Sequence, residues 1–148
     1  MSVGEVCNRE VIICRAEEPL AAAVALMRNR HVGCVVIVES GVQEPRPIGI
    51  LTDRDIVIRV LAETRDLNSI RVADVMSHDL VTAKQEDTIL DAIELMRDKG
   101  VRRIPILNPQ GGLTGILTVD DVVELLAEQL TDLVKLCGRE IQHERSRG

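Results

Sequence analysis

The chain of 148 residues is long enough to bury a core, and its 45% hydrophobic and 28% charged residues are typical of a folded globular protein. Its formal charge of −6 disfavours nucleic acid as a partner, because the phosphates of DNA and RNA bind to positively charged surfaces. The lack of Phe, Tyr and Trp also disfavours it, because bases stack on such aromatic side chains. The longest apolar run, residues 20–27, is far shorter than the roughly 20 residues of a membrane span, so we expect a cytoplasmic protein without a membrane partner.

An internal duplication organises most of the chain. Residues 3–38 align on residues 72–107 without a gap, and Leu26-Met27-Arg28 falls on Leu95-Met96-Arg97. The first copy then carries a loop three residues longer, after which two related stretches, 49–55 and 115–121, align again. A duplication of this size predicts two copies of one supersecondary unit.

Each copy has the pattern of a β-α-β-β-α unit, too small to bury its sheet alone. Apolar and β-branched runs predict strands, and apolar residues at helical spacing predict helices. In the first copy the expected elements are a strand at 11–13, a helix at about 19–30, strands at 34–38 and 48–51, and a helix from Thr52. In the second copy they are a strand at 80–82, a helix at 88–99, strands at 104–107 and 113–117, and a helix from Thr118. Asp87 suits the N-cap of the 88–99 helix, and Gly100 suits its end.

These patterns divide the chain into a first repeat at 1–62, a polar linker at 63–71, a second repeat at 72–137, and a charged C-terminal tail at 138–148 that we expect to fray. The last helix keeps an apolar stripe well past the end of its counterpart: Val122, Val123, Leu126, Leu130, Leu133, Val134 and Cys137. Such a stripe predicts a dimer contact, although packing against the protein's own core explains it equally well.

The two seven-residue stretches mark strand-to-helix junctions. The first junction reads Gly49-Ile50-Leu51-Thr52-Asp53-Arg54-Asp55, and the second reads Gly115-Ile116-Leu117-Thr118-Val119-Asp120-Asp121. The first amides of a helix lack partners and carry partial positive charge, so an anion can bind there. The Thr and the Asp add a hydroxyl and a carboxylate, and the Gly lets a ligand approach the backbone. The alternative interpretation is a plain capping box, in which the carboxylate returns to the Thr amide.

Two β-α-β-β-α copies that each end in Gly-hydrophobic-x-Thr-x-x-Asp resemble a tandem pair of CBS domains, also called a Bateman module. The resemblance covers residues 3–136. It implies a mixed α/β (α+β) fold of two pseudo-symmetric repeats packed through their sheets. Because no catalytic domain accompanies the repeats, it also implies a stand-alone regulatory module.

The resemblance further implies two pseudo-symmetric sites, in the cleft between the repeats, for adenosine-containing ligands such as AMP, ADP, ATP, S-adenosylmethionine or dinucleotides. By motif, Asp55 and Asp121 would take the ribose hydroxyls, and the hydroxyls of Thr52 and Thr118 would reach phosphate or ribose.

The family pattern adds contacts from the strands of each repeat. In the second copy these would be Thr82 and the stretch Arg102-Arg103-Ile104-Pro105, with Arg103 as the phosphate contact. The first copy departs from this pattern, because Ile13 stands in the place of Thr82 and Gly33-Cys34 stand in the place of the arginines. We therefore expect the second copy, with Asp121, to supply the stronger contacts.

No set of nucleophile, base and orienting group is visible, so we expect no enzymatic activity. The four Cys residues lack zinc-binding spacing and are expected to be small core residues, a metal or redox role assembled in space being the alternative. The leading hypothesis is a homodimeric sensor that binds AMP, ADP or ATP as a regulatory ligand, requires no cofactor and signals to an effector protein. The alternative is a ligand-free dimeric scaffold with degenerate sites.

Overall fold

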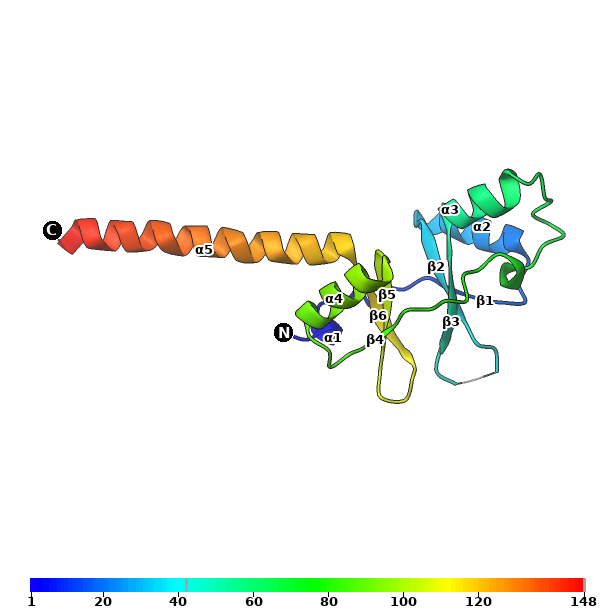
Figure 1. Ribbon diagram of the computed structural model, residues 1–148, viewed down its shortest axis with the longest axis horizontal. Coiled ribbons are helices and arrows are strands. Elements are labelled where there is room, and N and C mark those ends of the chain that lie inside the picture. Colours follow the sequence, from blue (N-terminus) through cyan, green and yellow to red (C-terminus); the bar gives the residue numbers. More distant parts are fainter. Residues whose placement is uncertain (42, 148) are drawn as a thin grey trace.

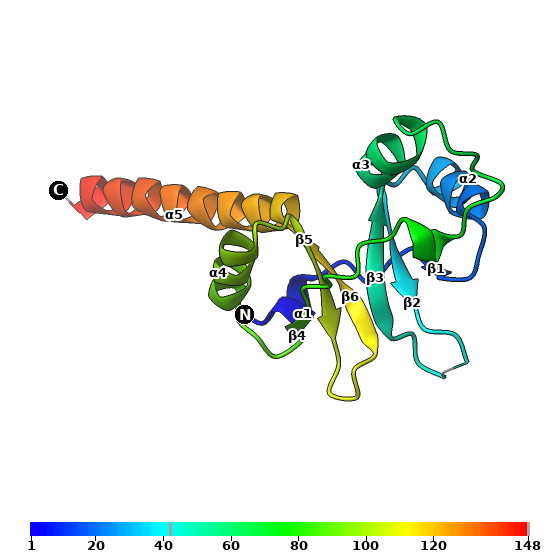
Figure 2. The ribbon, with the colours of Figure 1, turned by 45° about the vertical axis from the view of Figure 1, so that its right-hand side comes forward.

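The computed structural model describes residues 1–41 and 43–147, and its two halves repeat one arrangement (Figure 1). Each half contains a three-stranded sheet, with strand orders β1-β2-β3 and β4-β5-β6. In each sheet the first pair of strands is parallel and the second is antiparallel. The two sheets lie in the middle of the molecule, and the helices lie on their outer sides (Figures 1 and 2).

The elements of the two halves correspond one to one. The first half comprises α1 (Val3–Val6), β1 (Ile13–Arg15), α2 (Leu20–Arg30), β2 (Cys34–Val38), β3 (Pro47–Thr52) and α3 (Asp53–Ile56), continued by a π-helical turn at Val57–Leu61. The second half comprises a 3₁₀ turn at Val72–Asp74, β4 (Ala83–Lys84), α4 (Ile89–Lys99), β5 (Arg103–Leu107), β6 (Leu113–Thr118) and α5 (Val119–Arg147). The predicted α/β class and the predicted element order are therefore confirmed.

Three predicted boundaries were wrong by one to three residues. The strands expected at 11–13 and 80–82 instead run over Ile13–Arg15 and Ala83–Lys84. Val11 packs in the cluster between the sheets, and Ile12 packs against the core of the first repeat while its carbonyl oxygen accepts the amide of Val36 at 2.9 Å. Thr88, not Asp87, is the N-cap of α4, since its hydroxyl accepts the amide of Asp91 at 3.1 Å. Gly100 ends that helix with a φ of 66°, as predicted.

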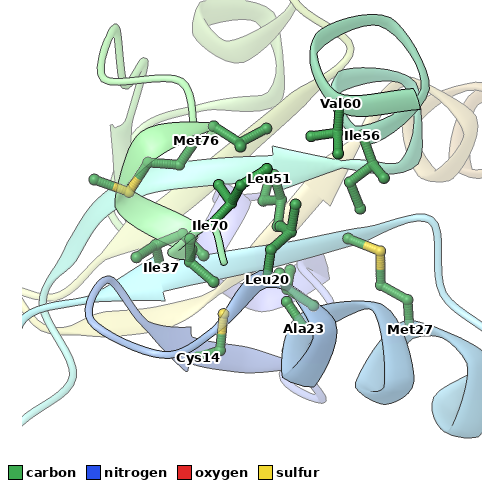
Figure 3. Packing of buried hydrophobic residues seen from close by; sticks show 13 residues of the cluster. Cys14, Leu20, Ala23, Met27, Ile37, Leu51, Ile56, Val60, Ile70 and Met76 are labelled. Carbon is green, nitrogen blue, oxygen red and sulfur yellow. The ribbon is translucent and has the colours of Figure 1, made fainter. Parts of the chain in front are cut away.

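The core of the first repeat lies between its sheet and α2 (Figure 3). Leu20, Ala23 and Met27 are buried on one face of α2 and pack with Ile37 and Leu51 from the sheet. A matching cluster in the second repeat contains Ala92, Met96, Ile104 and Leu117. Aliphatic, methionine and cysteine side chains build both cores, which contain no aromatic residue.

The leading segment of each repeat crosses over and packs on the other repeat. Val3 and Cys7 belong to the core of the second repeat, and the amides of Val3 and Gly4 donate to Asp87 and Gln85. In the same way, the cluster of the first repeat includes buried residues from the linker and the start of the second repeat: Ile70, Val72, Val75 and Met76. Each repeat is therefore completed by the segment that precedes the first strand of the other repeat, and this exchange holds the two repeats together.

A third apolar cluster joins the two sheets. It contains Val36 and Val38 from β2 and Ile116 from β6, with Val11, Cys34, Ile50 and Leu113 packed against it. The backbones of the two repeats are also hydrogen-bonded to each other. The amide of Ile116 donates to the carbonyl oxygen of Asn8, and the amide of Ser77 donates to the carbonyl oxygen of Ile50. The expectation that the repeats pack through their sheets is confirmed.

The last helix, α5, projects away from the rest of the chain (Figures 1 and 2). It runs without a break to Arg147, so the expected fraying after residue 138 was wrong for the described part of the tail, and residue 148 lies outside the described residues. Val122 at the start of the stripe is buried in the core of the second repeat. The rest of the stripe does not fold back on the core, because side chains such as Leu130 and Leu133 are 63% and 58% exposed. Within residues 1–41 and 43–147, no helix is both long enough and apolar enough to cross a membrane.

Candidate ligand-binding clefts between the repeats

Each junction places its Thr at the end of a strand and its Asp in the first turn of a helix. Thr52 closes β3 and caps α3, its hydroxyl accepting the amide of Asp55 at 3.2 Å. Thr118 closes β6, and its hydroxyl accepts the amide of Asp121 at 3.1 Å. The predicted strand-to-helix geometry is present at both positions.

The capping-box interpretation applies to the first junction. One oxygen of Asp55 accepts the amide of Thr52 at 3.1 Å, so this carboxylate turns partly toward its own backbone. At the second junction the hydrogen bonds among the described residues include the Thr118 cap but no return of the Asp121 carboxylate to that amide. Capping leaves the second oxygen of Asp55 available to a ligand.

The glycines of the junctions have a different role from the expected one. A Cβ atom on Gly115 would lie 2.6 Å from both the carbonyl oxygen of Asn8 and the sulfur of Cys7. A Cβ on Gly49 would lie 2.7 Å from the carbonyl oxygen of Ser77. The space beside each glycine is thus taken by the leading segment of the other repeat, and not left for a ligand.

A cavity of about 300 Å³, the first cleft, opens between the repeats. From the first repeat it is lined by Ile50, Thr52, Asp53, Arg54 and Asp55. From the second repeat it is lined by Ser77, Asp79, Leu80, Val81, Val101, Arg102 and Arg103. The first junction therefore shares a cavity with the two arginines of the second repeat.

A smaller cavity of about 200 Å³, the second cleft, is its pseudo-symmetric counterpart. It is lined by Ile116, Thr118 and Arg103 of the second repeat and by Asn8, Glu10, Val11, Ile12, Val32, Gly33 and Cys34 of the first. The segment across from the second junction is thus Gly33-Cys34, which carries no cationic side chain. Asp121 lies outside this lining, and the charged groups in it are Glu10 and Arg103.

Arg103 lines both clefts. It begins β5, is half-buried, and pairs in register with Thr118 of β6. Its guanidinium also influences Cys34, since burial raises the pKa of that thiol while the Arg103 charge acts to lower it. Arg102 is more exposed and forms an ion pair with Asp120 at 3.6 Å.

Three further residues of the predicted site, Thr82, Ile104 and Pro105, line neither cleft. Ile104 and Pro105 are buried within β5, and Thr82 is half-buried just before β4, next to the cleft-lining Val81. Sequence reasoning missed the apolar wall made by Leu80, Val81 and Val101. The sequence signal for this wall was the apolar pair Leu80 and Val81, which the sequence pattern assigned to a strand and not to the site.

The cysteines lie apart from any cluster of metal-binding groups. Cys7 and Cys14 are buried, Cys34 is half-buried and Cys137 is exposed. Burial raises the pKa of Cys14 to about 12, which keeps it a neutral thiol. Across the described parts of the chain, no three His, Cys, Asp or Glu residues gather closely enough to hold a metal ion.

Comparison with known proteins agrees with this architecture. The family model of the CBS domain matches residues 3–62 and again residues 72–128. The chain belongs to the CBS domain family. It is a CBS pair, a regulatory type of module whose two repeats enclose both clefts.

Two curated relatives and one solved structure illustrate the similarity. An uncharacterized protein of Methanopyrus kandleri, MK0525, is 37% identical over 125 residues, which are 84% of this chain and 62% of that protein. The CBS domain-containing protein YhcV of Bacillus subtilis is 35% identical over 121 residues, 82% of each chain. The CBS domain pair of protein MJ0100, solved in complex with methylthioadenosine and S-adenosyl-L-methionine, has a TM-score of 0.74 at 17% identity and covers 87% of this chain and 98% of that chain. The chain spans 62% of the length of each of the first two curated relatives that it matches.

Proposed function

We propose that this CBS pair is a regulatory module whose first cleft binds an adenosine-containing nucleotide of the AMP, ADP or ATP type. The observation that carries the proposal is the make-up of that cleft. A hydroxyl and a carboxylate of the first repeat, Thr52 and Asp55, share one cavity with Arg102 and Arg103 of the second.

Each part of such a ligand finds a matching group in the first cleft. The free oxygen of Asp55 can accept both hydroxyls of a ribose, and Arg103 suits a phosphate through charge-assisted hydrogen bonds. The apolar side chains of Leu80, Val81 and Val101 suit the face of a base. A volume of about 300 Å³ is at the lower end for small-molecule sites, which favours a mononucleotide over a dinucleotide.

The second cleft is the weaker candidate. Its volume is about 200 Å³, and Asp121 lies outside its lining. The sequence-based expectation that Asp121 supplies the stronger contact is therefore replaced by a proposal centred on Asp55. We infer one principal nucleotide site per chain.

A ligand in the first cleft touches both repeats, so its affinity depends on how they are placed. It can shift that placement only by binding one arrangement more tightly than another. We infer that the protein works as a cytoplasmic, homodimeric sensor, without catalysis and without a required cofactor, and that an effector protein reads the change.

Calorimetry on three proteins tests the proposal. Wild type, Asp55→Asn and Asp121→Asn are titrated with AMP, ADP and ATP, and with methylthioadenosine and S-adenosylmethionine because the MJ0100 pair binds these two. Loss of a hydrogen bond to a charged group costs about 1.5–3 kcal/mol, so Asp55→Asn should weaken binding at least tenfold. Asp121→Asn, the matched control, should stay within about threefold. An equal loss in both variants would contradict the assignment of the first cleft.

The scaffold alternative has one supporting observation, the return of the Asp55 carboxylate to the Thr52 amide. A carboxylate committed to capping would leave the cleft without its ribose acceptor. Thermal unfolding separates the two functions, because a ligand at a hundred times its dissociation constant adds about 2.7 kcal/mol to the free energy of unfolding. No stabilisation by any of the five compounds would favour the scaffold.

A further inference from the structure

The projecting helix α5 exposes an apolar stripe along much of its length. Val123, Leu126, Leu130, Leu133 and Ile141 recur at helical spacing, and each is at least 49% exposed. Figures 1 and 2 show most of α5 extending beyond the body of the molecule. With 29 residues, the helix is about 44 Å long at 1.5 Å per residue. An isolated helix with such a stripe gains stability only by covering it.

The charges along α5 are divided between its two halves. Residues 119–133 carry acidic groups only: Asp120, Asp121, Glu124, Glu128 and Asp132. Residues 134–147 are mainly basic, with Lys135, Arg139, Arg145 and Arg147 against Glu140 and Glu144. Two such helices side by side in parallel would bring acidic half against acidic half. In an antiparallel pair each acidic half lies beside a basic half.

We propose that α5 pairs with α5 of a second copy of this chain, in antiparallel orientation and around the stripe. In the register that centres the stripe, Leu130 lies opposite the partner's Leu133. Leu126 then lies opposite the partner's Cys137. This contact gives the proposed homodimer a specific interface, and it does not depend on nucleotide binding.

A groove at the base of α5 supports the same orientation. It has a volume of about 430 Å³ between α4 and α5, and its wall is mostly apolar: Ile93, Met96, Val101, Val119, Val122, Val123 and Leu126. Arg97 and Arg102 lie at its edge. In the antiparallel register the last two turns of the partner helix reach this groove. They bring the partner's Ile141 to the apolar wall and the partner's Glu144 near the two arginines. A parallel partner would end at the far end of α5 and leave the groove open.

Sedimentation of the full chain without nucleotide tests the pairing. Wild type should be a dimer at tens of micromolar. Leu130→Glu places a charge in the stripe and should raise the dissociation constant of the dimer at least tenfold. Thr131→Glu adds the same charge one residue further, on another face of α5, and serves as the matched control. Leu130 is exposed, so the variant should keep the thermal stability of the monomer. A monomeric wild type, or a dimer that Leu130→Glu leaves unchanged, would overturn the proposal.

Disulfide mapping tests the orientation. Leu126→Cys places a thiol opposite the exposed native Cys137 of the partner if the helices are antiparallel. Mild oxidation followed by peptide mass spectrometry should give a cross-link between positions 126 and 137 of different chains, and the wild type oxidised in parallel is the control. Links of 126 to 126 and of 137 to 137 would contradict the antiparallel register. Because these experiments contain no nucleotide, a negative result would contradict the helix pairing and not the proposed nucleotide site. Likewise, a failure to bind nucleotide would not contradict the helix pairing.

Discussion

Asp55 and Arg103 come from different repeats and line the same cleft. Asp55 lies in the first turn after β3, and Arg103 begins β5 in the other sheet. The two sheets pack face to face through Val36, Val38 and Ile116, which brings the end of one strand near the beginning of the other. Any ligand held by both groups therefore bridges the two repeats.

Arg103→Ala should weaken nucleotide binding by about 10-fold to 100-fold, because a charge-assisted hydrogen bond to phosphate contributes about 1.5–3 kcal/mol. Arg102→Ala is the matched control and should cost less, since Arg102 is exposed and paired with Asp120. Calorimetry with AMP and with adenosine separates the roles of the two ligand parts. Adenosine lacks the phosphate and should bind equally to wild type and Arg103→Ala. An equal loss for AMP and adenosine would show that Arg103 acts on the fold and not on the phosphate.

The crossing of the leading segments predicts a strong effect at Gly115. Gly115→Ala puts a methyl group 2.6 Å from the backbone oxygen of Asn8, so it should lower the free energy of unfolding by about 1–3 kcal/mol. Gly138→Ala is the control, because no neighbouring atom lies within 4 Å of a Cβ there. It should slightly raise the helix content, since Ala favours a helix over Gly by about 0.5–1 kcal/mol. Urea unfolding and circular dichroism measure both changes, and comparable stability in the two variants would contradict the crowding at Gly115.

The sequence predicted most elements because their signals are local. The duplication, the α4 stop at Gly100 and the Thr caps at residues 52 and 118 depend on spacing along the chain. Three features could not be predicted because they depend on which segments meet in space. Val11 and Ile12 are apolar because they pack against buried clusters, and Gly115 is required because the carbonyl oxygen of Asn8 lies beside it. Arg103 lines a cleft together with Asp55 and not with Asp121. In a duplicated fold, the residues that complete a site with a motif can come from the other copy. Spacing along the sequence does not show which copy supplies them.

The exchange of leading segments also predicts where truncating mutations are costly. Val3 is fully buried in the core of the second repeat, although the sequence assigned it to the first. Val3→Ala should lower the free energy of unfolding by about 2 kcal/mol, at roughly 0.8 kcal/mol per buried methylene plus the cost of a cavity. Val57→Ala, at a position that is 54% exposed, should change it by less than about 0.5 kcal/mol. Urea denaturation measures both, and near-equal values would mean that the segment before β1 is only loosely attached.

The N-cap of α4 predicts a pH-dependent contribution to stability. The amide of Thr88 donates to Asp91 at 3.1 Å, and this backbone bond, followed by the bond to the Thr88 side chain, holds the pKa of Asp91 below its ordinary value of 3.8. A carboxyl group whose pKa is lower in the folded state stabilises the protein above its unfolded pKa, and this contribution is lost as the pH falls through the folded pKa. Asp91→Asn should therefore be less stable than wild type at pH 7, and the gap should narrow as the pH is lowered through and below 3.8. Glu94→Gln, an exposed change within the same helix away from the cap, should show a smaller gap at pH 7. Urea denaturation across this pH range checks the sign, and a gap that widens toward low pH would contradict the role of the ionised cap.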